Sequence, residues 1–321
     1  MKKLLALLLA ICLCLSLAAC GEDEPNSDKG NNNQNNGSKE TVAGGEKPGP
    51  TQTPTTGKEI PKLDQDLTGS LGDNVTFVLD TNGKLTISGE GKMHSFDYED
   101  GKVNTPWFEV RECIRTVVIE EGIFNISAHT FFKCVNMESI VIPSTVYQIE
   151  AVSFNECRSL KEIVIPEGVS RLGNNTFGGC TSLTRIVLPE SLTSIAQDCF
   201  RGCSFTSIVI PDSVDFFGSS LFSGCTALKD VQLPASLDEV SGYCFSGCES
   251  LEVIVIPEGV EGIDDKAFSG CTALKEITIP ASVTSIGNDV FKNCDNVTII
   301  GEAGSYAETY ANNNGIPFRA K

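Results

Sequence analysis

The sequence is poor in the side chains on which catalysis and metal binding most often depend. Its 321 residues include two histidines, His94 and His129, a single tryptophan and three methionines. A histidine-based catalytic triad has few candidates here, and the G-x-S-x-G, H-E-x-x-H and phosphate-loop motifs do not occur. We therefore expect a protein that is not an enzyme, with no catalytic residue, no metal site and no cofactor.

Basic residues are also scarce. The chain has 24 lysines and arginines against 42 aspartates and glutamates, a formal net charge of −18 at pH 7. Binding to nucleic acid or to anionic lipid headgroups needs a dense basic patch that displaces counterions, so we exclude nucleic acid as a partner. The acidic surplus also keeps an exported repeat protein soluble, and it identifies no ligand by itself.

What the sequence has in abundance is one repeated pattern. From residue 134 to residue 294 a cysteine recurs every 23 residues, with a single interval of 22, and a phenylalanine stands three residues before each cysteine. In most copies a leucine, an isoleucine and a proline follow at three, six and nine residues. The cysteines are Cys134, Cys157, Cys180, Cys203, Cys225, Cys248, Cys271 and Cys294, and the phenylalanines are Phe131, Phe154, Phe177, Phe200, Phe222, Phe245, Phe268 and Phe291.

A unit of this length cannot bury its own apolar side chains, so consecutive units must stack into a solenoid. The period, with leucine and isoleucine at constant places, is typical of leucine-rich repeats. In the segment KEITIP, Ile277 and Ile279 alternate with polar residues, which predicts a half-buried strand that Pro280 ends. The next residues predict a return across a second face, and residues 289–294 suit one short helical turn. We predict a mainly β solenoid with a parallel sheet on one face and short helical turns.

The repeated pattern C-x-x-L-x-x-I-x-I-P-x-x-V-x-x-I-x-x-x-x-F-x-x resembles the bacterial leucine-rich repeats named after Treponema pallidum, also called BspA-like. The resemblance covers about eight coils across residues 111–300. It extends to residues 67–110, which are similar to a β-hairpin-rich N-terminal cap, and to residues 301–321, which are similar to a short helical C-terminal cap. It implies attachment to proteins of a host or neighbouring cell, without naming a ligand. Departures from the pattern are Met137, Phe205 and Gln232.

The N-terminus predicts export and lipid attachment. Residues 1–19 contain two lysines, an apolar run and small residues before Cys20, as in a lipoprotein signal peptide. Residues 17–20 resemble a lipobox, which implies cleavage before Cys20 and a diacylglycerol on its sulfur; the alternative is an ordinary cleaved signal in which Cys20 is incidental. Residues 20–66 are rich in Asn, Gly, Pro and Thr and predict a disordered tether. We expect a lipid-anchored, extracytoplasmic protein at the cell membrane, exposed on the cell surface.

Two local features favour structural roles. The turn around Asp80, Asn82 and Gly83 resembles the start of a calcium loop but lacks the remaining ligands. An Asn-Gly pair between two alternating strands is instead a strong signal for a β-hairpin. Trp107 is expected to anchor the core of the N-terminal cap rather than a ligand site.

The repeat cysteines predict a column of buried, reduced thiols. Successive coils of a solenoid lie about 4.8 Å apart, whereas a disulfide needs β-carbons about 3.8 Å apart that face each other. A column also cannot converge on a tetrahedral zinc ion. On this basis, serine in place of an inner cysteine such as Cys225 would bury a hydroxyl without a partner and destabilise the fold by roughly 1–3 kcal/mol.

The outward positions of the predicted strands indicate a candidate ligand face. The residue seven places after the repeat cysteine is a valine in most coils, and the residue two places before it is variable in a way that suits specificity. Valine is a good strand former on any pleated surface, which explains the stripe without a ligand, whereas a contiguous exposed apolar patch usually marks an interaction site. The candidate positions are Val118, Val141, Val164, Val187, Val209, Gln232, Val255 and Thr278.

Three classes of function are compatible with these features. A surface-exposed binding protein, namely an adhesin or receptor for a protein or glycan on a host or neighbouring cell, is favoured. Stacked repeats present a long continuous sheet, and the predicted tether projects it away from the membrane. The alternatives are a structural cell-envelope protein without a soluble ligand, and an enzyme, which would need a cleft with perturbed titratable groups.

Overall fold

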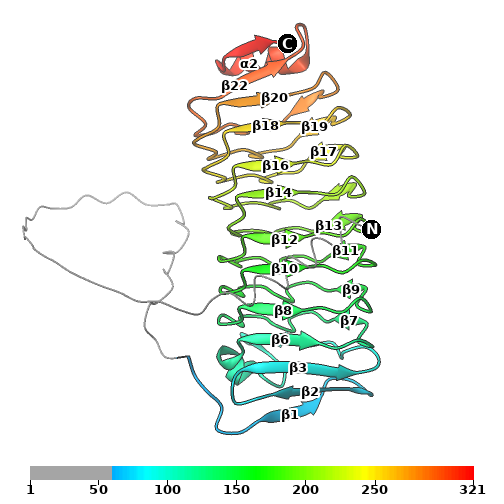
Figure 1. Ribbon diagram of the computed structural model, residues 1–321. Helices are drawn as coiled ribbons and strands as arrows, with labels where there is room; N and C mark the ends of the chain where they lie inside the picture. The colour runs from blue at the N-terminus through cyan, green and yellow to red at the C-terminus, as the bar shows by residue number, and fades with distance from the viewer. Residues whose placement is uncertain (1–59) are drawn as a thin grey trace, which may run out of the picture. The chain divides into compact units, whose positions relative to one another are not determined.

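A computed structural model describes residues 60–321 of the chain. The predicted signal peptide, Cys20 and residues 20–59 of the predicted tether lie outside the described residues. Within residues 60–321, no helix is both long enough and apolar enough to cross a bilayer. These residues form a β solenoid with a cap at each end (Figure 1), which confirms the predicted fold.

The N-terminal cap is an antiparallel sheet that leads into the solenoid. Strands β2 (Val75–Leu79) and β3 (Lys84–Gly89) form the predicted hairpin. Asp80 Oδ1 accepts hydrogen bonds from the backbone amides of Asn82 (2.8 Å) and Lys84 (2.9 Å), so this carboxylate closes the hairpin turn. The other elements of the cap are β1 (Leu67–Ser70), β4 (Tyr98–Glu99), β5 (Lys102–Val103) and the 3-10 helix η1 (Phe108–Cys113).

Beyond the cap, successive coils contribute strands to two parallel sheets on different sides of the stack, and the hydrogen-bonded ladder of each sheet is interrupted between some coils (Figure 1). The first sheet continues from β3, and the second sheet consists of two-residue strands. The strands of the first sheet are β6 (Thr116–Ile119), β8 (Ser139–Val141), β10 (Glu162–Val164), β12 (Arg185–Val187), β14 (Ser207–Val209), β16 (Asp230–Gln232), β18 (Val253–Val255), β20 (Glu276–Thr278) and β22 (Thr298–Gly301). The strands of the second sheet are β7 (Asn125–Ile126), β9 (Gln148–Ile149), β11 (Arg171–Leu172), β13 (Ser194–Ile195), β15 (Phe216–Phe217), β17 (Glu239–Val240), β19 (Gly262–Ile263) and β21 (Ser285–Ile286).

The alternation of apolar and polar residues explains the strands of the first sheet. Ile277 in β20 is fully buried, whereas Glu276 and Thr278 on either side of it are half-buried. Pro280 follows the strand, and its carbonyl oxygen accepts a hydrogen bond from the amide of Val283 (3.2 Å), which turns the chain toward β21. Because the coils stack in register, equivalent positions of successive repeats lie next to each other.

The short helical turn expected on the third side of each coil takes the form of a hydrogen-bonded turn that does not continue as a helix. In the last coil, the amide of Lys292 donates to the carbonyl oxygen of Asp289 (3.1 Å). Asp289 and Asn293 have φ values of 54° and 63°, in the left-handed region where a right-handed helix cannot continue. The residue before each repeat cysteine has positive φ in all eight coils, which explains why most of these residues are glycine.

One residue on this third side is poorly suited to its backbone. Val152 has φ of 63°, and a β-branched residue is a genuine outlier in this region. We expect Val152→Asn to raise the free energy of unfolding by about 0.5–1 kcal/mol, because asparagine tolerates left-handed backbone that costs other residues about 1–2 kcal/mol. The partly buried contact of the valine with the core offsets part of the gain.

Urea denaturation of the two proteins measures this difference. The reverse change, Asn175→Val, is the matched control, because Asn175 occupies the same place in the next coil with φ of 53° and should lose a similar amount. A lower stability of Val152→Asn would show that the packing of the valine outweighs the backbone strain.

A ladder of stacked phenylalanine rings forms the centre of the core. Rings of successive coils are separated by 5.2 to 5.9 Å between centroids, as for Phe154 and Phe177 (5.2 Å). Trp107 of the N-terminal cap stacks on Phe131 at 6.2 Å and donates its indole N–H to the carbonyl oxygen of Thr130 (3.0 Å). The prediction that Trp107 anchors the cap is therefore confirmed.

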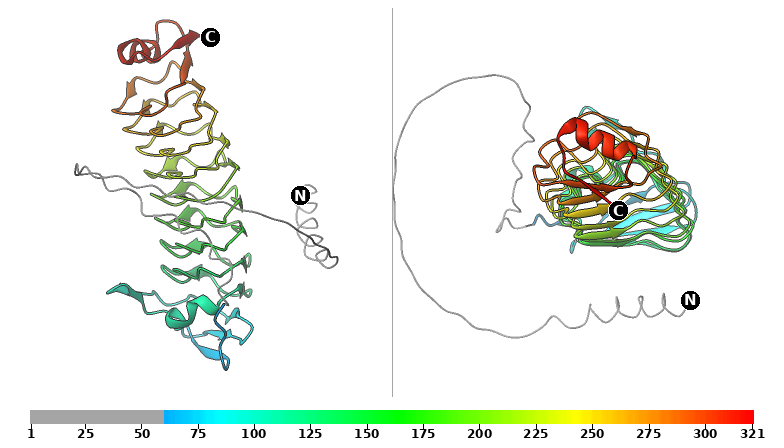
Figure 2. Two further views of the ribbon diagram at one scale, coloured as in Figure 1. Left: turned by 90° about the vertical axis from the view of Figure 1, so that its left-hand side faces the viewer. Right: turned by 90° about the horizontal axis from the view of Figure 1, so that it is seen from above.

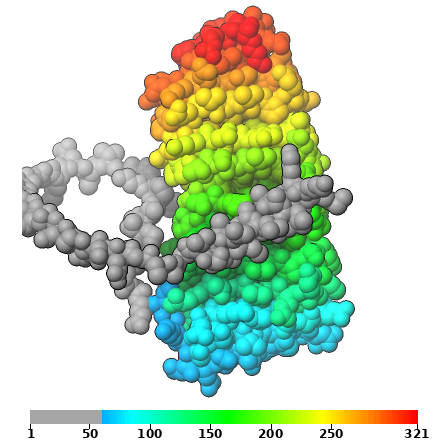
Figure 3. Space-filling view, viewed as in Figure 1, coloured from blue at the N-terminus to red at the C-terminus, as the bar shows by residue number. Residues whose placement is uncertain are grey.

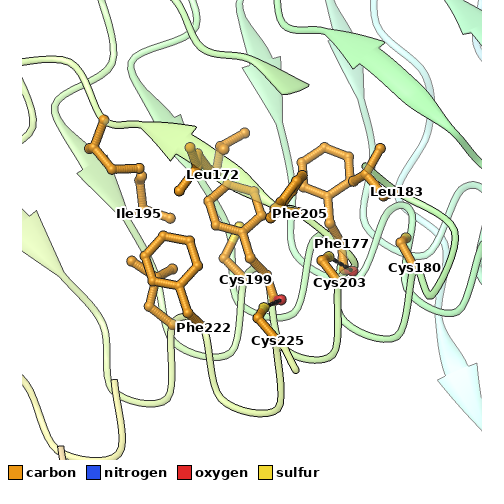
Figure 4. Close-up of a cluster of buried hydrophobic side chains, with 14 of the residues drawn as sticks. Leu172, Phe177, Cys180, Leu183, Ile195, Cys199, Cys203, Phe205, Phe222 and Cys225 are labelled. Carbon is orange, nitrogen blue, oxygen red and sulfur yellow. Dashed lines mark hydrogen bonds between the residues drawn. The ribbon is translucent and has the colours of Figure 1, made fainter. Parts of the chain in front are cut away.

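The thiol column lies beside this ladder, as predicted. All eleven cysteines of the described residues are unpaired and buried. Each repeat cysteine after the first donates its Sγ–H to the carbonyl oxygen of the phenylalanine in the preceding coil, for example Cys225 to Phe200 at 3.1 Å (Figure 4). The prediction that a hydroxyl here would lack a partner is therefore wrong, because stacking brings a carbonyl oxygen of the preceding coil to each repeat thiol after the first. The other pairs are Cys157–Phe131, Cys180–Phe154, Cys203–Phe177, Cys248–Phe222, Cys271–Phe245 and Cys294–Phe268.

We accordingly expect Cys225→Ser to lower the free energy of unfolding by about 1 kcal/mol, no more than Cys225→Ala, since the new hydroxyl keeps the hydrogen bond to Phe200. Burial raises the pKa of the Cys225 thiol to about 12, so iodoacetamide should label it only after unfolding. Chemical denaturation of both variants checks the ranking. A serine variant clearly less stable than the alanine variant would mean that the hydroxyl is unpartnered after all.

The C-terminal cap closes the open end of the stack. Its elements are α2 (Tyr306–Asn314) and β23 (Phe318–Ala320), which pairs in parallel with β22. Helix α2 lies across the end of the coils (Figure 2), and its residue Tyr310 contacts the last ring of the ladder, Phe291, at 6.1 Å. The helix starts at Ser305, whose hydroxyl accepts the amide of Glu308 (3.4 Å).

Candidate binding face on the first sheet

The structure places the predicted ligand-face residues together on the outward side of the first sheet. They follow one another from coil to coil, and the coils appear as successive bands in the space-filling view (Figure 3). Residues paired in adjacent parallel strands point to the same side of a sheet, so these residues form one stripe. The pairs are Val118–Val141, Val164–Val187, Val209–Gln232 and Val255–Thr278.

Exposure along the stripe is uneven. Val141, Val209 and Val255 are 60–61% exposed, and Val164 is 45% exposed. The other stripe residues except Gln232 are half-buried by their neighbours, and for these the strand preference of valine is explanation enough. Among the predicted ligand-face residues, the most accessible to a partner are therefore the four exposed valines and Gln232.

Two further exposed valines lie on the same face; the first was not predicted from the sequence, and the second was placed only in the variable row. Val78 in β2 is 42% exposed and lies in the same row, because it pairs with Thr86, which pairs with Val118. Val253 is 49% exposed and stands in the variable row beside the stripe. A signal for Val253 was present, since it is the apolar exception in that row.

Ion pairs line the side of the stripe. Lys161 lies 3.0 Å from Glu138, and Arg319 lies 3.0 Å from Glu276. Three of the four side chains are well exposed and Glu276 is half-buried, so each pair contributes little to stability. Within each pair the opposite charges cancel, so these residues add little net charge beside the stripe.

A groove interrupts the first sheet between β16 and β18. It has a volume of about 830 Å³. No backbone ladder joins the two strands, in contrast to β18 and β20. Its lining residues include Asp212, Lys229, Asp230, Gln232, Leu233, Glu252, Val253 and Val255.

The second sheet presents a different surface. Its outward residues are mostly polar, with Phe216 the exposed apolar residue among them. Beside Gly262, four carboxylates surround a hollow of about 290 Å³. A hydrogen bond with Asp264, together with burial and the nearby negative charges, raises the pKa of Glu239. This acidic hollow therefore lies on a different surface from the valine stripe.

Neither histidine takes part in a metal-binding group. The ring of His129 stacks on Tyr98 at 5.8 Å, and its Nδ1 lies 3.3 Å from the carbonyl oxygen of Phe96, which joins the β4–β5 arm to the first coil. Among residues 60–321, no three His, Cys, Asp or Glu side chains gather in a way that would hold a metal ion.

Comparison with protein families identifies the repeat. The model of the BspA type leucine rich repeat region matches residues 102–229 and 193–308 in this chain. Together these matches cover more than half of the sequence. No curated protein matches the chain in sequence.

Several solved structures similar to this chain are bacterial leucine-rich repeat proteins. One from Bacteroides ovatus is 24% identical, covers 78% of this chain and 76% of its own, and has a TM-score of 0.50. One from T. pallidum is 23% identical, with coverages of 82% and 98% and a TM-score of 0.46, and a leucine rich cell surface protein from Faecalibacterium prausnitzii is 21% identical, with coverages of 77% and 98% and a TM-score of 0.30. The period, the solenoid and the family match agree, and the chain belongs to the BspA-type leucine-rich repeat family.

Proposed function

We propose that this protein is an extracytoplasmic adhesin or receptor that binds a protein partner through the outward face of the first sheet. The observation that carries this proposal is the stripe itself, in which Val141, Val209 and Val255 are each 60–61% exposed. Exposed apolar side chains aligned on one face of a soluble domain usually mark an interaction site. Stacked repeats offer such a face over a long distance, as other repeat proteins do for their ligands.

The chemistry of the stripe favours a protein over a glycan. Saccharides are commonly held by exposed aromatic rings and polar side chains, whereas the exposed residues of the stripe are aliphatic apart from Gln232. Apolar aliphatic contacts at the centre of an interface with charged residues at its rim are typical of protein partners. The Glu138–Lys161 and Glu276–Arg319 pairs supply such a rim.

The binding function is tested by incubating the purified chain with extracellular-matrix extract and with extracts of neighbouring bacteria. A partner retained by the chain should be released when the exposed stripe valines are replaced, as set out in the Discussion. If nothing is retained above an unrelated solenoid of similar charge, the structural cell-envelope function replaces the binding function.

The lipid anchor is a second part of the proposal, and it rests on residues 17–20 of the sequence. We expect Cys20→Ser to abolish acylation and to move the protein out of the membrane fraction, because the thioether to the lipid cannot form. Metabolic labelling with a fatty acid and protease treatment of intact cells measure attachment and exposure. Lipid label retained on the variant would contradict the anchor at Cys20, and resistance of the wild-type chain to protease on intact cells would contradict surface exposure.

A further inference from the structure

We propose that the groove between β16 and β18 binds an extended peptide segment of the partner that carries alternating apolar and basic side chains. The inference rests on the proposed function and names the specific site and the ligand class within the same face. Three independent features of the groove carry it: its residue types, its unpaired backbone and its charge.

The residue types on the two walls depart from the repeat in opposite directions. Gln232 on β16 stands where most other coils have valine, and Val253 on β18 stands where the other coils have Thr, Ser, Glu, Arg or Asp. Gln232 is exposed, and Val253 is 49% exposed. One wall therefore offers an amide for hydrogen bonding, while the other offers Val253 and Val255 as adjoining apolar contacts.

The backbone along the groove lacks the bonds that join other coils. Between β18 and β20, the amide of Lys275 donates to the carbonyl oxygen of Glu252 (2.8 Å), and the amide of Ile256 donates to that of Thr278 (2.9 Å). In the described part of the chain, no corresponding bond joins Glu252 to Lys229 or Leu233 to Val255. The missing bonds leave polar backbone groups along the groove available to an extended peptide that lies against its walls.

A boundary between two adjacent strands that no backbone ladder joins, here called a seam, does not make a binding site by itself. The seams between β8 and β10 and between β12 and β14 also lack a ladder. What distinguishes the β16–β18 seam is the coincidence of the missing bonds with the 830 Å³ groove and with the two exchanged residues. The other seams therefore serve as internal comparisons for the site.

The charge of the groove selects basic side chains. Asp212, Asp230 and Glu252 line it against a single cation, Lys229. Within residues 60–321, Asp230 lies in no ion pair, whereas Glu252 is paired with Lys275. A cleft lined mainly by one sign of charge raises the local concentration of oppositely charged ligands. The groove thus matches an extended segment with lysine or arginine flanking its apolar residues.

The test uses a labelled peptide of seven residues, alternating lysine and valine, with fluorescence anisotropy of the full chain as the readout. Two matched peptides replace lysine with glutamate or valine with serine. We expect the lysine–valine peptide to bind and both others to bind at least tenfold more weakly. Equal binding of the glutamate–valine peptide, or binding of none of the peptides, would overturn the proposal.

Substitutions locate the peptide on the protein. Asp230→Lys and Val253→Lys should each weaken binding of the lysine–valine peptide at least tenfold, whereas Gln148→Lys, at an exposed position of the second sheet, should leave it within twofold. Asp230 is exposed, so that its variant stays folded even if Val253→Lys does not. If both groove variants bind like the parent while stripe variants still lose the protein partner, the proposed function stands and the assignment to the groove falls.

Dimerisation through the groove in the absence of peptide, seen by light scattering and lost in Asp230→Lys, would identify a second copy of the chain as the occupant. That result would also overturn the assignment of the groove to a peptide.

Discussion

Replacing Phe200 with alanine should lower the free energy of unfolding by about 3–5 kcal/mol, the range for removal of a fully buried phenylalanine. Phe200 is 0% exposed and stacks between Phe177 (5.9 Å) and Phe222 (5.7 Å), with an edge contact to Phe205 (5.6 Å). The alanine leaves a cavity bordered by three rings that the backbone of neighbouring coils holds in place. The surroundings therefore have little freedom to collapse into it.

Urea denaturation followed by circular dichroism measures the loss. Phe216→Ala is the matched control, because this ring is 54% exposed on the second sheet and its removal should cost less than about 1 kcal/mol. Each coil contacts only its neighbours, so weakening the middle coil should also separate the unfolding of the two halves and lower the apparent m-value. A loss no larger than that of the control would contradict the view that the ring ladder holds the solenoid together.

The second large effect concerns binding. Val141→Lys, Val209→Lys and Val255→Lys combined should reduce affinity for the protein partner at least a hundredfold. The interface would then have to bury three ammonium groups in place of apolar side chains, and charged groups without partners are costly to desolvate. Thermal stability should stay within a few degrees, since all three valines are 60–61% exposed.

The matched control places the same three charges on the second sheet. Gln148→Lys, Ser194→Lys and Ser285→Lys lie at equivalent outward positions of β9, β13 and β21. Surface plasmon resonance with the retained partner compares the two triple variants. If the control loses affinity as strongly as the stripe variant, binding depends on net charge rather than on the valines, and if neither variant loses affinity the partner binds to a cap or to the turns.

Part of the candidate site could be predicted from single repeats. The alternation in KEITIP assigns Thr278 to the outward side, and the constant period carries this assignment to Val141 and Val209. The degree of exposure could not be predicted, because it depends on the side chains of the coils above and below. Val187 is half-buried whereas Val209 is 61% exposed, although both occupy the same repeat position.

For the cysteines, too, the sequence predicts the position of the side chain and the stacking of coils decides its contacts. Their spacing is sufficient to predict a buried, reduced column, because it rules out disulfide geometry between neighbours. Whether a thiol finds an acceptor depends on the distance to another coil, and the 3.1 Å contact of Cys225 with Phe200 exists only once the coils have stacked. Because a serine hydroxyl keeps this hydrogen bond, Cys225→Ser is expected to destabilise the fold less than the sequence alone predicts.

The sequence by itself determined the coil period, the parallel sheet on one face, the thiol column and which side of each strand of that sheet faces outward, whereas the second sheet and the stacking of the phenylalanine rings emerged only from the structure. It did so because a short repeat has one way to bury its apolar positions, namely against copies of itself. Tertiary structure alone decided where that regularity is interrupted. The groove between β16 and β18 coincides with missing hydrogen bonds between Lys229 and Glu252 and between Leu233 and Val255, and the fit of two adjacent coils is a property of their contact that neither repeat encodes separately.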